Sequence, residues 1–217
     1  MEARWRNLSL IVAVVAIIAV LYYVVLPLIP SLFTPAEEAI TFEGEYEGMQ
    51  LLMSSNNFYP ASIDSLEIGD AAEVDAFLAA KRDDYLALGT EEGNALAGLA
   101  GFYQELAETM KNKAMLNSSM NDFISLAASG SSVEACLDVE VFELNNNELA
   151  SIAKDEEALA AQAGSFSNRY PDYYAETDLA VVASALNNDA ADLRELMAEN
   201  DFIASEMIEI CREAGLA

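Results

Sequence analysis

The side chains that could carry chemistry in this chain are carboxylates and two cysteines, because histidine is absent. The 217 residues include 37 Asp and Glu, 10 Lys and Arg, two Cys and no His. Without His, the chain cannot build Ser-His-Asp or Cys-His catalytic sets, His-ligated haem or most catalytic zinc sites. Gly-x-Ser-x-Gly, phosphate-loop and dinucleotide-binding motifs are also missing. We therefore predict that the protein is not an enzyme and that it holds no cofactor.

The carboxylates favour a solvated acidic surface over a metal site or a catalytic pair. The densest stretches are residues 138–148 and 172–178, and neither has the Asp/Asn alternation and central Gly of an EF-hand. A di-iron site in a helical bundle would need a Glu-x-x-His motif. No two carboxylates stand out as an acid-base pair for glycoside hydrolysis. We expect no metal site, and only nonspecific cations along the acidic surface.

Cys136 and Cys211 are candidates for a disulfide. An even number of cysteines outside the cytoplasm indicates pairing, and the anchor described below predicts that location. The bond would close a loop of about 75 residues and stabilise the fold by roughly 4 kcal/mol on the chain-entropy model. Two separate buried thiols are the alternative. A redox-active pair is disfavoured because no Cys-x-x-Cys spacing is present.

An aromatic cluster surrounds Pro171 and consists of Phe166, Tyr170, Tyr173 and Tyr174. Aromatic side chains at a junction between a loop and a helix can bind a ligand or a protein partner. They can equally close the end of a helical bundle. We keep these four residues as candidates for a ligand or partner site.

Two asparagines are candidates for other roles. Asn200 falls in the apolar seam of the final predicted helix, where a polar residue can fix register or oligomeric state. It could instead face solvent if the seam drifts around the helix. Asn117 begins an Asn-Ser-Ser sequon and is a candidate glycosylation site.

The N-terminal region predicts a membrane anchor. Residues 8–29 are uncharged and mostly apolar, and as a helix they would extend about 33 Å, enough to cross a bilayer. Arg4, Trp5 and Arg6 precede this run and are typical of a cytoplasmic membrane interface. A signal peptide cleaved near residues 34–36 and a pilin-like helix packed in a filament are the alternatives. We expect a short cytoplasmic tail at 1–7, a transmembrane helix at 8–29 and everything after it outside the cytoplasm.

Beyond the anchor, the sequence predicts an all-α ectodomain. Residues 30–69 read as a Pro-containing neck and an irregular segment. Within it, the helical spacing of Phe42, Tyr46, Met49 and Met53 favours a short helix, although residues 40–46 also alternate as in a strand. Apolar periodicity, capping boxes and glycine stops then predict helices over 70–88, 90–110, 116–129, 131–144, 149–163 and 171–210. Residues 138–141 also fit a strand, residues 165–170 read as a loop, and Asp189 is a possible restart within the last helix. We expect an antiparallel bundle of five to seven helices over residues 70–217.

Three faces of these helices are expected to pack inside the bundle. The first is an apolar seam on the helix predicted over 90–110. The second, on the same helix, carries small residues that let another backbone approach closely. The third is an apolar face of the helix predicted over 131–144. The seam is Leu96, Leu99, Tyr103, Leu106 and Met110; the small residues are Gly93, Ala97 and Gly101; the third face is Val133, Cys136, Leu137, Val141 and Leu144.

The strong acidity narrows the partners. A formal charge of -27 repels nucleic acid and attracts basic partners. We predict a membrane-anchored, non-enzymatic extracytoplasmic interaction or structural protein, either an accessory subunit of a membrane or envelope complex or a self-assembling surface component. Its expected partners are the lipid membrane, through residues 8–29, and a protein or further copies of itself. The alternative is an extracytoplasmic ligand-binding helical module with no cytoplasmic output domain of its own.

Overall fold

The computed structural model describes residues 40–58, 69, 71–129, 132–175 and 177–216. These residues form six helices and no strand, which confirms the predicted all-α class. The helices are α3 (Phe42–Ser55), α4 (Ala71–Ala87), α5 (Glu91–Ala128), α6 (Ser132–Arg169), α7 (Pro171–Tyr174) and α8 (Leu179–Glu213). None of the helices in these ranges is long and apolar enough to cross a membrane. The predicted anchor at 8–29 and its flanking Arg4, Trp5 and Arg6 lie outside the described residues.

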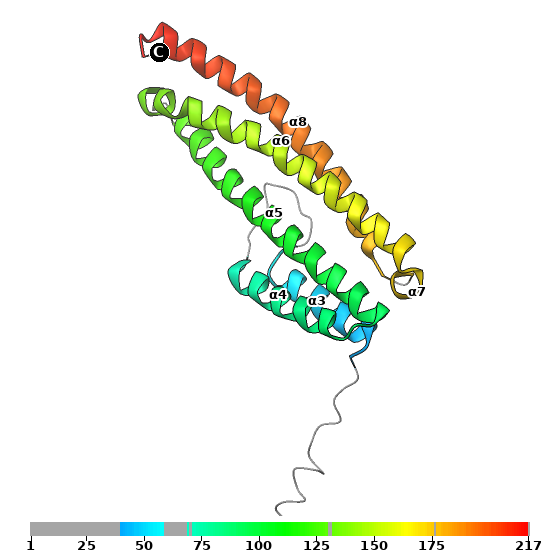
Figure 1. Cartoon of the computed structure of the whole chain (residues 1–217). Coiled ribbons are helices and arrows are strands. Elements are labelled where there is room, and N and C mark those ends of the chain that lie inside the picture. The colour runs from blue at the N-terminus through cyan, green and yellow to red at the C-terminus, as the bar shows by residue number, and fades with distance from the viewer. Residues whose placement is uncertain (1–39, 59–68, 70, 130–131, 176, 217) are drawn as a thin grey trace, which may run out of the picture. The chain divides into compact units, whose positions relative to one another are not determined.

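Three long helices form the frame of the compact unit that spans Phe42–Ala217. Helix α6 lies against both α5 and α8 and runs antiparallel to each of them, and the short α7 turns the chain between α6 and α8 (Figure 1). Helices α3 and α4 pack against the N-terminal half of α5. The unit therefore includes α3, although residues 30–69 were expected to form a neck outside the bundle.

The long helices are more continuous than the sequence predicts. Residues 90–129 were expected to form two helices, and residues 131–163 two more, but α5 and α6 are each single helices of 38 residues. Gly164 does not end α6, and the expected loop at 165–170 is helical up to Arg169. A glycine inside a helix costs only about 1 kcal/mol relative to alanine, which packing along the rest of α6 outweighs. The possible strand at 138–141 is also helix, and α8 passes through Asp189 without a break.

The connection between α4 and α5 follows the predicted capping chemistry. Gly89 adopts a positive φ of 63° after the end of α4, as a glycine C-cap requires. The Thr90 side chain then accepts a hydrogen bond from the Gly93 amide at 3.0 Å, which caps α5. A Cβ added at Gly93 would lie 2.4 Å from the Tyr85 carbonyl oxygen. Gly93 therefore allows the close backbone approach that the small-residue face predicted.

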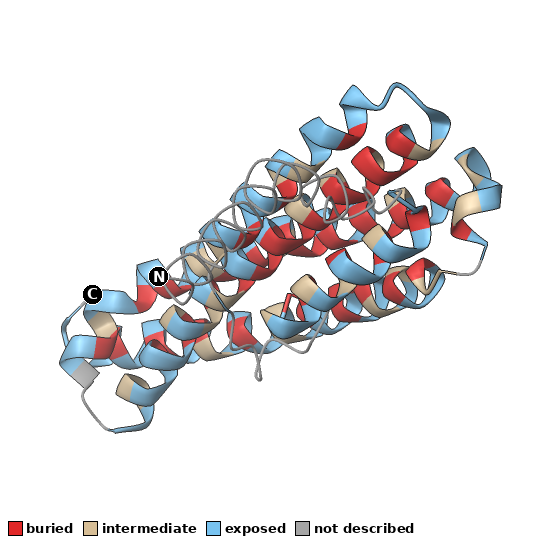
Figure 2. Ribbon diagram, turned by 90° about the horizontal axis from the view of Figure 1, so that it is seen from below, coloured by how far each residue is buried: buried red, intermediate tan, exposed pale blue. Residues whose placement is uncertain are grey.

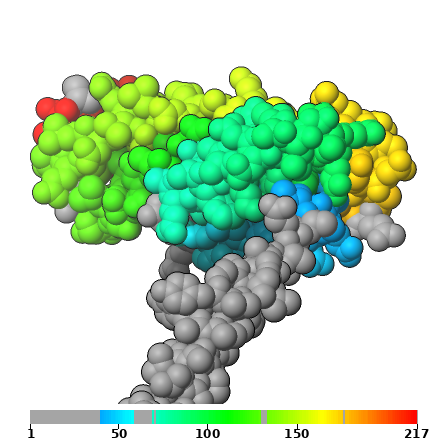
Figure 3. Space-filling view, turned by 60° about the horizontal axis from the view of Figure 1, so that its bottom comes forward, coloured from blue at the N-terminus to red at the C-terminus, as the bar shows by residue number. Residues whose placement is uncertain are grey.

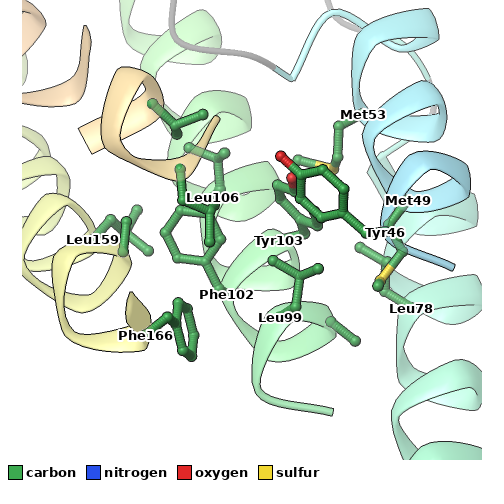
Figure 4. Close-up of a cluster of buried hydrophobic side chains, with 14 of the residues drawn as sticks. Tyr46, Met49, Met53, Leu78, Leu99, Phe102, Tyr103, Leu106, Leu159 and Phe166 are labelled. Carbon is green, nitrogen blue, oxygen red and sulfur yellow. The ribbon is translucent and has the colours of Figure 1, made fainter. Parts of the chain in front are cut away.

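The first core lies where α3 and α4 join the frame. It contains the whole predicted seam of α5, buried completely, together with α3 methionines and α6 side chains that converge on the same space (Figure 4). Phe102 packs edge-on against Phe166 with ring centroids 6.0 Å apart. Five other elements thus contribute to the burial of the N-terminal half of α5: α3, α4, α6, α7 and the start of α8.

Among the residues that the structure describes, the second core is built by α5, α6 and α8. Phe123 of α5 and Phe142 of α6 stack with centroids 4.3 Å apart, and Met207 packs in the same cluster from α8. Cys136 and Cys211 are joined beside it, with Cα atoms 5.6 Å apart and a separation of 75 positions in sequence. This geometry confirms the predicted disulfide.

The outward face of α6 corrects one expectation. Val133, Leu137, Val141 and Leu144 were expected to pack inside the bundle, but all four are exposed. Each side of a helix can be buried only against a neighbour, and the face that carries Ala135, Val139 and Phe142 takes that place instead. Figure 2 shows the resulting separation, with buried positions where helices face one another and exposed positions outside.

Candidate functional site

A groove between α3 and the α7 region collects aromatic and acidic side chains. Phe42, Tyr46 and Tyr173 supply aromatic surface, and the Phe42 ring centroid lies 5.4 Å from that of Tyr173. Figure 3 shows the surface of α3 beside that of the α7 region. The volume of the groove is about 400 Å³. We call it the aromatic groove, and its lining is Phe42, Glu43, Tyr46, Glu47, Gln50, Asp172, Tyr173, Ala175 and Thr177.

Asp178 holds two of these side chains in place. The Tyr46 hydroxyl donates to one oxygen of the Asp178 carboxylate, and Gln50 Nε2 donates to the other at 2.6 Å. The Asp178 amide in turn donates to the Tyr46 hydroxyl at 3.1 Å. Because these bonds link α3 to the start of α8, they fix one wall of the aromatic groove before any ligand enters.

The electrostatic potential of the aromatic groove is negative. Three of its lining residues are carboxylates, and among the described lining residues none is Lys or Arg. Partial burial, followed by the negative charges of Glu92, Glu91 and Asp172, raises the pKa of the Tyr173 hydroxyl above its ordinary value. Glu92 is held close by the Phe42 amide, which donates to its Oε1 at 2.6 Å. The arrangement suits a positively charged group.

The four predicted aromatic residues divide between packing and groove. Phe166 and Tyr174 are buried, stack with centroids 5.1 Å apart and close the end of the bundle. The Tyr174 hydroxyl donates to the Ala95 carbonyl at 2.7 Å. Tyr173 lines the aromatic groove, whereas Tyr170 packs partly buried beside Tyr174 and under the Arg169 guanidinium.

A layer of buried charge separates the two cores. Lys113 of α5, Glu156 of α6 and Asp189 of α8 meet there, and each falls between the first-core and second-core residues of its own helix. Lys113 Nζ donates to Glu156 Oε1 at 3.3 Å and also to the Asp189 carboxylate. Glu156 Oε2 is buried with no hydrogen-bond partner among the described residues.

The surroundings of the Glu156 carboxyl favour its protonated form. Burial raises its pKa to about 8, with Lys113 opposing the shift and Asp189 reinforcing it. The layer then holds one ammonium and one carboxylate, a balanced pair, beside a neutral acid. Burying two unbalanced carboxylates with one ammonium would cost far more free energy.

Outside the layer, a second groove runs between α5 and α6. Its volume is about 610 Å³, and it includes Met115, Glu148 and Asp155. Glu148 and Asp155 continue, at helical spacing, the α6 face that carries the exposed Val141 and Leu144. One side of α6 therefore presents apolar side chains first and acidic ones after them.

Both candidate asparagines lie within long helices, Asn200 in α8 and Asn117 in α5. Asn200 is buried and donates to Asn146 Oδ1 at 3.1 Å, so it faces the α6–α8 interface rather than solvent. Asn117 is half-buried within α5 and accepts a hydrogen bond from Asn121. Over the described ranges, no three Asp, Glu or Cys side chains converge in a way that could hold a metal ion.

Sequence reasoning missed the charged layer and half of the aromatic groove. Lys113 and Asp189 are 76 positions apart, and no local pattern connects them. Lys113 did carry a signal, because a basic residue follows Met110 where the apolar seam would continue towards Leu116. Phe42 and Tyr46 were noted only as helical spacing, since their contact with Tyr173 depends on tertiary packing.

Comparison of the chain with protein-family models, with curated proteins and with solved structures finds no match. Its function must therefore be inferred from the chemistry of its own surface.

Proposed function

We propose that the chain is a membrane-anchored, extracytoplasmic interaction or structural protein that is not an enzyme. It would act as an accessory subunit of a membrane or envelope complex, or assemble with further copies of itself. The observation that carries the proposal is the outer α6 stripe, four apolar side chains on one face of a helix. Their exposed fractions are 55% for Val133, 76% for Leu137, 50% for Val141 and 64% for Leu144.

The outer α6 stripe differs from scattered surface apolar residues. Its members recur at steps of four, four and three, so they lie along one line on the helix. Single exposed apolar residues are normal on soluble proteins, but a contiguous patch with a polar rim marks an interaction surface. Glu134, Glu140 and Glu148 are exposed neighbours on α6 and supply that rim. The acidic rim favours a partner with basic residues around an apolar centre.

The proposal is tested by native mass spectrometry of the full-length protein after gentle solubilisation. We expect a particle heavier than one chain, and its mass distinguishes self-assembly from a companion protein. A variant with Leu137→Asn and Val141→Asn should lose the added mass. Val181→Asn is the matched control, because Val181 is 68% exposed on α8 but lies outside the stripe.

Far-UV circular dichroism of each variant checks that the helices remain. Two results contradict the proposal: a wild-type protein that is monomeric and carries no companion, or an unchanged assembly in the stripe variant.

The aromatic groove favours the alternative of a ligand-binding module. Its volume of about 400 Å³ lies within the usual range for small-molecule sites, roughly 300–1,000 Å³. A module of this kind would need a partner to pass a signal across the membrane.

A further inference from the structure

We infer that the aromatic groove between α3 and α7 binds a small organic cation with an alkylated ammonium group. This inference does not depend on the interaction role proposed from the outer α6 stripe, because the stripe and the aromatic groove share no residue. It deepens the ligand-binding alternative by naming the chemical class of the ligand. It rests on three features of the aromatic groove: its rings, its carboxylates and its preformed shape.

The rings supply the contact surface for such a cation. Aromatic ring faces carry a partial negative charge and attract ammonium groups within about 6 Å of the ring centre. Tyr173 is the partly exposed ring, and the mostly buried rings of Phe42 and Tyr46, each 8% exposed, line the groove from α3 with centroids 6.1 Å apart. N-methyl groups have apolar surface that packs against rings, which a fully hydrated inorganic cation lacks.

The carboxylates supply the charge. Glu43, Glu47 and Asp172 line the aromatic groove, and Glu91 and Glu92 act on Tyr173 from α5. No three of the described carboxylates converge closely enough to hold a metal ion. A spread of negative charge around rings therefore matches a bulky cation with diffuse charge better than a compact metal ion, which needs several oxygens at about 2.0–2.6 Å.

The shape of the aromatic groove is set before binding. The Tyr46 ring is fixed by the hydrogen bonds of its hydroxyl with Asp178, and the same carboxylate fixes Gln50. A preformed site loses little side-chain entropy when the ligand enters. Asp178 is thus a positioning residue, since it holds Tyr46 in place and does not line the groove itself.

Isothermal titration calorimetry of the full-length protein with choline tests the inference. The decisive comparison is 3,3-dimethylbutan-1-ol, which has the same shape as choline but no charge. We expect choline to bind at least tenfold more tightly, and rising salt to weaken it. Phosphocholine distinguishes a lipid headgroup from a free cation, and we expect it to bind less tightly than choline because the carboxylates repel its phosphate.

Variants locate the site. Tyr173→Leu removes the ring, and Glu47→Gln removes a charge while keeping the shape, and each should weaken choline binding several-fold. Tyr170→Leu is the control, because Tyr170 is adjacent in the fold but does not line the groove. Thermal unfolding of each variant checks that it is folded.

Several results would overturn the inference. They are the absence of choline binding, equal binding of the neutral isostere, tighter binding of phosphocholine, or loss of binding in Tyr170→Leu with retention in Tyr173→Leu.

Discussion

The first and second cores each bury one end of the three long helices, but they are built from different elements. The first core draws on six helices and on aromatic and sulfur side chains such as Phe102, Tyr103 and Met53. Over the described ranges, the second core draws on three helices, α5, α6 and α8, and the disulfide lies beside it. Where fewer elements cover the helices, a covalent bond and buried amides replace apolar surface. We therefore expect different substitutions to destabilise each core.

The largest effect is expected at the charged layer between the cores. Lys113→Met removes the ammonium and leaves the buried Asp189 carboxylate without its counter-ion, which typically costs about 3–5 kcal/mol. Urea unfolding should show this loss, whereas Lys111→Met, at an exposed position of the same helix, should change stability by less than about 0.5 kcal/mol.

A triple variant sharpens that result. Lys113→Met combined with Glu156→Met and Asp189→Leu leaves no buried charge in the layer, and it should recover most of the lost stability. If Lys113→Met alone is as stable as the wild type, the layer does not hold the two cores together electrostatically.

Loss of the disulfide should destabilise the second core more than the first. The Cys136→Ala, Cys211→Ala variant is expected to lose about 2–4 kcal/mol, because its unfolded chain is no longer constrained. Hydrogen exchange should speed up in the first turns of α6 and the last turns of α8, while amides near Leu99 and Leu106 stay protected. Uniform loss of protection over both cores would instead show that they unfold as one unit.

Stability should fall as the pH rises through the neutral range. Burial raises the pKa of Glu156 in the folded state to about 8, whereas an unperturbed Glu has a pKa of 4.5. Between these two pH values the folded state binds a proton that the unfolded state has released. The contribution of Glu156 to stability is therefore fully present below about pH 4.5 and is lost as the pH rises towards 8. Glu156→Gln should flatten this dependence in urea unfolding.

Glu157→Gln is the control for that experiment. Glu157 is exposed, and its hydrogen bond with Arg194 lowers its pKa, so it should not titrate between pH 5 and 8. A Glu156→Gln variant with the same pH profile as the wild type would refute the assignment of the proton to Glu156.

The smallest effect is expected at the buried amides of the second core. Asn200→Ala removes the hydrogen bond to Asn146 and should cost about 1–2 kcal/mol. The exposed Asn187→Ala on the same helix should be close to neutral. If Asn200 also fixes oligomeric state, native mass spectrometry of Asn200→Ala will show a changed mass, which a purely structural role would not produce.

The sequence predicts what local patterns determine. The seam from Leu96 to Met110 is buried as expected, and Gly89 and Thr90 mark the end of one helix and the beginning of the next. These features depend on spacing and on backbone chemistry within a few residues. The sequence favoured the disulfide but left two separate buried thiols as the alternative, and the structure decides for the bond between Cys136 and Cys211.

The sequence could not show which of two apolar helix faces is buried, or which distant side chains come into contact. Two faces of α6 are apolar at helical spacing, and only tertiary packing decides that Val139 is buried and Leu137 exposed. Lys113 reads as an interruption of a helix until Glu156 and Asp189 are placed beside it. The aromatic groove was half visible, since Tyr173 was named but Phe42 reaches it from a distant segment.

The position of the disulfide has a mechanical consequence. Cys136 lies between Val133 and Leu137 in the sequence of α6, so the covalent bond to Cys211 leaves the helix beside the beginning of the outer α6 stripe. A force that a bound partner exerts on the stripe would pass through this bond directly into α8, bypassing the side-chain contacts of the second core. Helices α6 and α8 would then carry the load together, and a pull on the stripe would not separate α6 from α8.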